Sequence, residues 1–293
     1  LEGRNMVQID KAKLSLTDRW IYSRLNDAAL SIEKAMEEYH FNDAAQTVYS
    51  FFWNDFCDWY IEASKEKMLH GSEDEKDLQV SILMDILESS MRLMHPFLSF
   101  ITEEIYQKLP NHKGDVISAQ YPIYNEADKD NEADSSMESL QEVVRVVRAV
   151  RSSLGIGPEK KLKVVVRPSK DNPYASFYKE EEKILSSFMG ASSVIVDSEG
   201  SEDTAKAFPC HGSGFEAFVF VRDAIDVEGE IKRLEDEIRK NQASLEQSLK
   251  KLQNENFITH AKPEAIEKEK GKKAEFEEKI QKSTEHIALL KTL

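Results

Sequence analysis

DVEGEIKRLEDEIRKNQASLEQSLKKLQ, residues 226–253, is the stretch that decides the fold of the last seventy residues. Its apolar residues recur at steps of three and four and then continue in the same phase: Val227, Ile231, Leu234, Ile238, Leu245 and Leu252. This spacing keeps one narrow apolar seam on a helix, as a two-helix coiled coil requires. A helix of about 25 residues at roughly 1.5 Å per residue would be close to 40 Å long.

A second helix follows a break at Asn254–Pro263. Its stripe has heptad spacing and consists of Phe276, Ile280, Ile287 and Leu290. Two such helices joined by a short connection are antiparallel neighbours, so residues 225–293 are predicted to form a coiled-coil hairpin arm. So thin a rod buries little apolar surface. This favours a role in extending toward a partner over a role in stabilising the fold. Its seam also has polar members, namely Asn241, Ser248, Glu269 and Lys273.

Length and composition predict two or three structural units for the 293 residues. The sequence has no run of some 18 apolar residues, so no membrane span is expected. The net charge of −15 is uneven, because residues 71–140 carry 15 acidic and 5 basic residues. A polyanion should therefore avoid that face and contact other parts. Cys57 and Cys210 lack metal-ligand spacing and fit a reducing, cytoplasmic compartment.

Residues 1–110 are predicted to form a bundle of at least four helices. Thr17 with Asp18 behind it is typical of a helix N-cap, and Asn42 can cap the next helix. Pro96 is expected to kink or restart the chain. The second helix is rich in aromatic residues, most of which must be core: Tyr49, Phe52, Phe56, Trp59 and Tyr60.

The rest of the chain before the arm has a different rhythm. Residues 111–136 lose periodicity and are predicted to be a linker, with an extended piece around 116–124. Residues 137–224 are predicted to form a small α+β module with helices over 138–154 and 172–189. Its strand candidates are 162–166, 193–196 and 215–221. The predicted fold class is therefore mainly α, with a helix bundle, a small α+β junction module and a coiled-coil arm.

No catalytic constellation is evident in the sequence. Gly155-Ile156-Gly157 lacks the further residues of a phosphate loop. Cys210 and His211 could be drawn as nucleophile and base, but adjacent residues rarely face each other, and a loop is the favoured interpretation. This chain alone is expected to be neither an enzyme nor a metal protein.

Binding signals are stronger. Three arginines at three-residue steps share one flank of the helix 138–154, and two lysines follow: Arg145, Arg148, Arg151, Lys160 and Lys161. The flank is either simply solvated or a ridge that contacts phosphates. On the arm, basic residues alternate with Glu and many can form i, i+4 ion pairs. Excess positive charge lies near the expected tip, at Lys262, Lys268, Lys270, Lys272 and Lys273.

Several sequence blocks resemble the anticodon-binding bundle of the valyl-tRNA synthetase family. They are LTDRWI at 16–21, YHFNDAA at 39–45, FCDWYIE at 56–62, HPF at 95–97 and ITEEI at 101–105. The isoleucyl and leucyl families share them in part. The tail separates the families, because DVE at 226–228 and LQNENF at 252–257 resemble the valyl arm. The isoleucyl family typically ends in a cysteine-rich zinc module, which two cysteines cannot supply.

The resemblance implies that the whole enzyme is a class I synthetase that activates valine with ATP and Mg, esterifies it to tRNA and hydrolyses misacylated threonine. The His-Ile-Gly-His and Lys-Met-Ser-Lys-Ser signatures of that chemistry are absent here, so no cofactor is expected in this chain. The bundle, whose first helix is expected to start before Leu1, would bind the anticodon loop. The arm would lie against the outer corner of tRNA(Val).

For this role the resemblance and the residue types indicate Arg19, Arg24, Phe41 and Asn42 on the anticodon side. The junction arginines and lysines and the five arm lysines named above complete the predicted tRNA-binding set. The protein is expected to be a monomer. We also expect the polar distal arm to be mobile without RNA. Two alternatives remain, a coiled-coil protein–protein interaction module and the matching region of an isoleucyl or leucyl enzyme.

Overall fold

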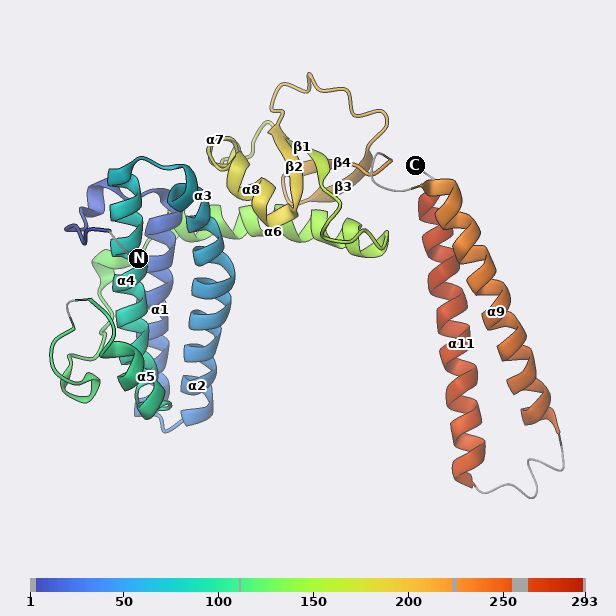
Figure 1. The fold of residues 1–293 in the computed structure, drawn as a ribbon, viewed down its shortest axis with the longest axis horizontal. Helices are drawn as coiled ribbons and strands as arrows, with labels where there is room; N and C mark the ends of the chain where they lie inside the picture. Colours follow the sequence, from blue (N-terminus) through green and yellow to red (C-terminus); the bar gives the residue numbers. More distant parts are fainter. Residues whose placement is uncertain (1–3, 111, 223–225, 255–262, 292–293) are drawn as a thin grey trace. The chain divides into compact units, whose positions relative to one another are not determined.

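The computed structural model describes residues 4–110, 112–222, 226–254 and 263–291, which form two compact units. The first unit comprises residues 1–144 and 173–188, and the second comprises 145–172 and 189–293. The chain is mainly helical with one small four-stranded sheet and two long final helices (Figure 1). This confirms the predicted fold class. No described helix is both long and apolar enough to cross a bilayer.

The first unit is an antiparallel helix bundle (Figure 1). Its long helices are α1 (Leu16–Glu37), a rod built from α2 (Phe41–Tyr49), η2 (Ser50–Ile61) and α3 (Glu62–His70), and α4 (Glu73–Met94), followed by α5 (Ser99–Tyr106). Because α1 and α4 run opposite to the rod, the α1–α2 and α4–α5 turns lie at the same end of the bundle. We call that end the bundle tip.

Helix α1 begins two residues earlier than predicted. Its N-cap is Ser15, whose hydroxyl accepts from the backbone N–H of Asp18 at 3.3 Å, while the Asp18 carboxylate accepts from the N–H of Ser15 at 3.1 Å. This reciprocal pair is a capping box. Thr17, the predicted cap, is buried inside the first turn. Thr17 was wrongly predicted as the cap, because Asp18 forms the capping box with Ser15, three positions before it.

Asp18 also organises the bundle core. Its buried carboxylate accepts from the hydroxyl of Tyr60 at 2.7 Å and from the ammonium of Lys67 at 2.7 Å. The Tyr60 oxygen accepts in turn from Gln79 at 2.8 Å. Burial and the Asp18 charge raise the pKa of the Tyr60 hydroxyl well above its ordinary value, so the hydroxyl remains a donor. One network therefore ties α1, the rod and α4 together.

The rod contains a π-helical segment, η2, which carries most of the aromatic residues. Phe52, Phe56 and Tyr60 follow at four-residue steps, and successive ring centroids are 5.9 Å and 6.3 Å apart. The rings thus pack along one face and fill the bundle. Asn42 does not cap this rod, because the N-cap position is His40 and Asn42 lies in the first turn of α2.

The predicted linker is ordered against α1. Residues 116–118 form a 3₁₀ turn, η3, rather than an extended piece, and η4 spans Glu126–Asp128. The amide of Asn26 donates to the carbonyl of Asn125 at 2.9 Å and accepts from its N–H at 2.8 Å. Helix α6 (Asn131–Ser153) starts seven residues earlier than predicted. Its first turns are polar, so the apolar periodicity became visible only further along.

Two short helices complete the first unit, where a single helix was predicted. They are α7 (Ala175–Glu180) and α8 (Glu182–Met189). Helix α8 packs on the rod, since the rings of Trp59 and Phe188 have centroids 4.4 Å apart. Lys183 forms an ion pair with Glu66 at 2.7 Å beside this contact.

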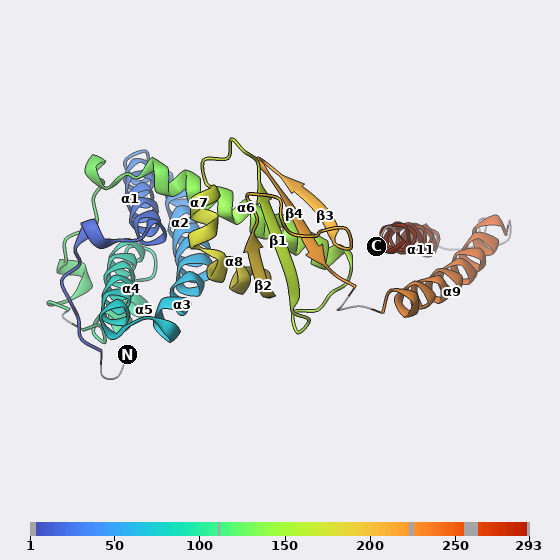
Figure 2. The same ribbon diagram turned by 90° about the horizontal axis from the view of Figure 1, so that it is seen from above.

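The second unit contains a sheet with the strand order β2-β1-β4-β3 (Figure 2). Its strands are β1 (Leu162–Pro168), β2 (Ala191–Val196), β3 (Phe208–Gly212) and β4 (Phe215–Phe220). β1 pairs in parallel with β2 and antiparallel with β4. The loop prediction for Cys210 and His211 was wrong, because both lie in the edge strand β3. Pro209 is compatible with an edge, where a missing donor costs no ladder bond.

The arm consists of α9 (Val227–Gln253) and α11 (Pro263–Leu290), which pack along each other. Asp226 is the N-cap of α9, and its side chain accepts from the N–H of Gly229 at 3.0 Å. Near the start of α9 and the end of α11 the buried residues are mostly apolar, namely Leu234, Ile287 and Leu290, with Ser283 as a polar member.

Further along the arm, the buried seam positions are polar. The hydroxyl of Ser248 donates to the carboxylate of Glu269 at 2.9 Å. Lys272 and Lys251 lie 3.1 Å and 3.6 Å from the same carboxylate. The predicted polar seam is thus present at Ser248 and Glu269, which satisfy each other.

Candidate nucleic-acid interface

The bundle tip presents aromatic side chains to solvent. Tyr39 lies in the α1–α2 turn with φ of 60° and is 78 % exposed. Phe41, the first residue of α2, is 52 % exposed, and its ring meets that of Tyr39 edge to face at 6.2 Å. A left-handed backbone at a non-glycine residue is uncommon and costs energy. Here it holds the Tyr39 ring outside the bundle.

A second aromatic pair lies further along the rod. The rings of Tyr49 and Trp53 stack at 6.3 Å with an interplanar angle of 6°. Tyr49 is 62 % exposed and Trp53 is 51 % exposed. Their four-residue step places them on the same helix face, away from the face that carries the partly buried Phe52 and the buried Phe56 and Tyr60. We call Tyr39, Phe41, Tyr49 and Trp53 the aromatic ridge.

The aromatic ridge has the kind of surface on which unpaired nucleobases stack. Exposed flat rings offer stacking surfaces for bases whatever their sequence. The sequence predicted Phe41 as an anticodon-side contact. It predicted Tyr49 only as one of a mostly buried set of aromatic residues, and it gave no prediction for Trp53. One feature of the sequence could have indicated their exposure. Tyr49 and Trp53 do not belong to the series Phe52, Phe56 and Tyr60, whose four-residue spacing forms the face packed into the bundle.

The two predicted anticodon-side arginines do not join this ridge. Arg19, near the start of α1, forms a two-pronged ion pair with Asp130, with contacts of 2.6 Å and 3.1 Å, and a contact of 2.7 Å with Glu132. These carboxylates raise the pKa of the Arg19 guanidinium. Arg24 is held by Asp55 at 2.9 Å. Burial opposes the charge of Arg24, but Asp55 outweighs it and raises the pKa. Both cations form ion pairs inside the first unit.

Phe41 and Asn42 are exposed at the tip, at the far end of α1 from Arg19. At about 1.5 Å per residue, Arg19 and the end of α1 are separated by roughly 27 Å. The four predicted anticodon-side residues therefore form no single patch.

The junction residues are also divided. Arg145, Arg148, Lys160 and Lys161 are exposed. Arg151 is only 7 % exposed. Its guanidinium donates to the backbone carbonyls of residues 157, 160 and 190 at 2.6, 2.8 and 3.2 Å. The predicted three-arginine ridge is thus not exposed as a whole, because the last arginine turns inward against the loop that follows α6.

The arm lysines differ in their partners. Lys262 lies outside the described residues. Lys270 pairs with Glu267 at 2.8 Å, and Lys273 lies 3.7 Å from Glu277. Lys272 belongs to the Glu269 contact described above. Lys268 is exposed and forms no ion pair with any residue of the described ranges. Within α11 these cations lie at the end next to the connection between the two arm helices.

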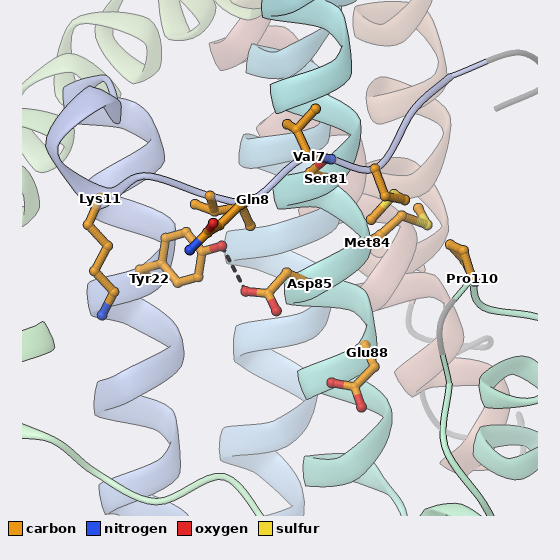
Figure 3. Close-up of a pocket in the computed structure, with 11 residues that line it drawn as sticks. Val7, Gln8, Lys11, Tyr22, Ser81, Met84, Asp85, Glu88 and Pro110 are labelled. Carbon is orange, nitrogen blue, oxygen red and sulfur yellow. Dashed lines mark hydrogen bonds between the residues drawn. The ribbon is translucent and has the colours of Figure 1, made fainter.

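A hollow of about 570 Å³ lies beside α1 and α4, under the segment that precedes α1 (Figure 3). The N–H of Val7 donates to the hydroxyl of Ser81 at 2.9 Å and holds the segment across the helices. Inside, Tyr22 donates to Asp85 at 2.8 Å, as Figure 3 shows. The lining is mixed, and Asp85 and Glu88 make it a poor site for an anion.

Catalytic and metal-binding arrangements are not found in the described part of the chain. The Cys210 thiol donates to the carbonyl of Ala217 at 3.3 Å, and burial raises its pKa to about 11. A thiol held in this form is a poor nucleophile. His211 lies 3.5 Å from Glu216 instead. No group of three or more metal-ligating side chains occurs among the described residues.

Comparison with known families identifies both ends of the chain. Residues 18–166 match the family model "Anticodon-binding domain of tRNA ligase". Residues 226–291 match the model "Valyl tRNA synthetase tRNA binding arm". The first match contains the whole aromatic ridge, and the second contains the arm lysines from Lys262 to Lys273.

Similar whole proteins are valine–tRNA ligases. The enzyme of Treponema denticola is 40 % identical over 294 residues, which is 96 % of this chain and 32 % of the relative. That of Treponema pallidum is 35 % identical and covers 94 % of this chain and 31 % of the relative. That of Enterococcus faecalis is 32 % identical over 100 % of this chain and 33 % of the relative. The chain spans about a third of the length of these relatives.

Proposed function

This chain belongs to the valyl-tRNA synthetase family and carries its anticodon-binding domain and tRNA-binding arm, and from that premise we propose that it places tRNA(Val) on the enzyme. In the proposal, the bundle tip receives the anticodon loop and the arm lies along the outer corner of the tRNA. The whole enzyme would join valine to tRNA(Val) with ATP and remove misacylated threonine through parts outside this chain.

The aromatic ridge is the observation that carries the proposal. Anticodon bases are unpaired and can splay out to stack on aromatic rings. Four exposed rings from one turn and one helix face supply such a surface, and they lie within the anticodon-binding match. Exposed apolar rings often mark a surface that a partner covers. Flat rings pack best against other flat groups, so the ridge favours a partner with exposed bases.

The arm supports the second contact by its charge. The lysines of α11 are exposed or half-exposed, and Lys268 has no carboxylate partner in the described ranges. A phosphate backbone is the partner that such cations favour, because each contact releases condensed counterions. The acidic stretch 71–140 repels a polyanion. A bound tRNA is therefore expected to lie away from that part of the surface.

Filter binding of the 293-residue chain to valine, isoleucine and leucine tRNAs tests the proposal directly. We expect tRNA(Val) to bind most tightly, and a tRNA(Val) transcript with an isoleucine anticodon to lose that advantage. Equal binding to all three tRNAs would mean that this chain does not discriminate among them. Concentration-dependent dimerisation in light scattering, with no binding of any tRNA, would favour the protein–protein alternative.

Substitution of Trp53 by Ala tests the ridge. Loss of one stacked base costs about 1–3 kcal/mol, so we expect tRNA(Val) affinity to fall roughly 5- to 150-fold with no change in folding. Leu69→Ala is the matched control, since Leu69 is an exposed apolar residue of α3 outside the ridge. If W53A and L69A bind tRNA equally well, the ridge is not the anticodon contact.

A further inference from the structure

The strongest positive charge of the chain lies neither on the bundle tip nor on the arm. Residues 145–167 contain seven Lys and Arg against one Glu, in a chain whose net charge is −15. They cover the last turns of α6, the loop that follows and strand β1. Such a local excess within an acidic protein marks a surface for a polyanion.

Several of these cations lack a neutralising partner. Arg145, Lys160 and Lys161 are exposed, and none forms an ion pair with a residue in the described ranges. Lys163 differs, because it is paired with Glu202 at 2.9 Å. We call Arg145, Lys160 and Lys161, together with the exposed Arg148, the junction surface.

The buried Arg151 fixes the backbone conformation of the loop that carries this surface. Its guanidinium binds the carbonyls of Gly157 and Lys160, so the loop is fixed against the end of α6, and a third bond to the carbonyl of Gly190 fixes the start of β2. The planar fork of an arginine is suited to such multiple bonds, whereas a lysine is a point donor. Burial lowers the pKa of Arg151, and the nearby Glu159 only partly offsets that cost.

The arrangement also brings like charges together. A side chain added at Gly190 would meet the Arg151 guanidinium at 3.8 Å and the Lys161 ammonium at 3.9 Å, so both cations flank the same point. Gly190 has φ of +60°, a conformation that favours glycine, and its missing side chain leaves this space open. Two neighbouring cations repel each other in the free protein. An anion bound beside them relieves that repulsion.

From this geometry we infer that the junction surface is a third RNA contact, which binds the sugar–phosphate backbone through Lys160, Lys161, Arg145 and Arg148, and that Arg151 is its positioning residue. The inference rests on the proposed function, because it takes tRNA as the polyanion. Lysine and arginine contacts to phosphate carry no base information. The junction surface therefore adds affinity for any tRNA and leaves discrimination to the bundle.

The test is the salt dependence of tRNA binding by a Lys160→Ala/Lys161→Ala double variant. Each phosphate contact that is removed reduces the slope of log K against log salt by about 1, so we expect the slope to fall by about 2. The decrease in affinity should be the same factor for tRNA(Val) and for a non-cognate tRNA. The matched control is Lys170→Ala/Lys206→Ala, which removes two exposed lysines elsewhere in the same unit.

The outcomes separate this inference from the proposed function. If the unaltered chain binds tRNA(Val) while K160A/K161A and K170A/K206A have equal slopes, the junction surface is not an RNA contact and the proposed function stands. If the unaltered chain binds no tRNA at low salt, both fail.

A second variant tests the role of Arg151. Arg151→Lys keeps the charge but loses the fork, so we expect it to flatten the salt slope as K160A/K161A does. Combining the two changes should add nothing further, because they act on one element. A fully additive effect on the slope would mean that Arg151 itself contacts the RNA and would overturn its assignment as a positioning residue.

Discussion

At the scale of single residues, position decides the role of a cation more than its spacing in the sequence does. Arg145, Arg148 and Arg151 follow one another at equal steps, yet only the last is buried. Arg151 reaches the end of α6, where the chain turns back and offers carbonyls of the following loop. Helical periodicity contains no information about that turn, so the sequence could place the arginines on one flank but could not separate them.

The hydrogen bonds of Tyr60 make a residue-scale prediction. Tyr60→Phe leaves the buried Asp18 carboxylate without one donor and Gln79 without its acceptor. An unsatisfied buried polar group costs about 1–3 kcal/mol, so we expect the free energy of unfolding of the bundle to fall by that amount. Urea unfolding followed by tryptophan fluorescence, to which the buried Trp20 contributes, measures it. Tyr49→Phe, which removes an exposed hydroxyl, is the control and should change little.

Asp197 predicts how the sheet responds to acid. Its carboxylate is buried, which opposes ionisation, but it accepts from Arg167 at 2.8 Å and from the N–H groups of Ser201 and Glu202. These bonds outweigh burial and hold its pKa well below the ordinary 3.8. A lowered pKa stabilises the fold above the ordinary value, and the stabilisation is lost as pH falls through the lowered pKa.

Asp197→Asn should therefore destabilise the sheet at pH 7 and lose its difference from the unaltered protein in acid. Removing one partner of a buried ion pair costs about 3 kcal/mol, and amide exchange of strand β1 at several pH values measures the effect. Asp203→Asn, at an exposed carboxylate of the same loop, should leave the pH profile unchanged. A pH-independent difference between D197N and the unaltered protein would contradict this account.

At the scale of elements, apolar periodicity was sufficient for the arm and insufficient for the sheet edge. The three- and four-residue steps predicted α9 and α11 and their polar seam positions at Ser248 and Glu269. Strand β3 was missed because Phe208–Gly212 contains Pro, His and Gly, which are typical of loops. Its conformation is dictated by pairing with β4, a contact that local sequence does not encode.

The arm carries an element-scale prediction. Its apolar seam, at Leu234, Ile287 and Leu290, lies near the start of α9 and the end of α11, whereas Ser248 and Glu269 occupy the seam further out. We therefore expect distal arm amides to exchange faster than those near Leu234 in the free protein, and to slow when tRNA binds. Equal protection along the whole free arm would count against this.

Replacing Ser248 and Glu269 together by Leu is the matched variant. Exchanging a buried polar or ionic contact for packed apolar residues is often neutral or stabilising by about 1–4 kcal/mol. The double variant should therefore slow exchange in the distal arm of the free protein and leave the segment around Leu234 unaffected.

At the scale of the whole molecule, charge is distributed unevenly between the two units. The first unit contains the acidic stretch and uses cations such as Arg19 and Arg24 internally. The second unit contains the junction surface and the arm. Net charge alone would have argued against a nucleic-acid partner, and only the distribution along the sequence pointed the other way.

The arm lysines provide a whole-molecule prediction. Replacing Lys268, Lys270, Lys272 and Lys273 by Ala should reduce tRNA affinity and flatten its salt slope, by up to about 1 for each phosphate that the variant no longer binds. Filter binding across a salt series measures both. Lys279→Ala/Lys282→Ala, further from the connection between the arm helices, is the control. An unchanged slope in the quadruple variant would remove this part of the arm from the contact surface.

The unequal burial of the three tryptophans has an optical consequence. Trp20 is enclosed in the bundle, Trp59 lies against Phe188, and Trp53 is half exposed on the aromatic ridge. A neutral collisional quencher such as acrylamide therefore reaches the indole of Trp53 first, and the fluorescence that remains comes from Trp20 and Trp59. The chain thus contains a natural fluorophore on the aromatic ridge and less accessible ones inside the first unit, without any label being attached.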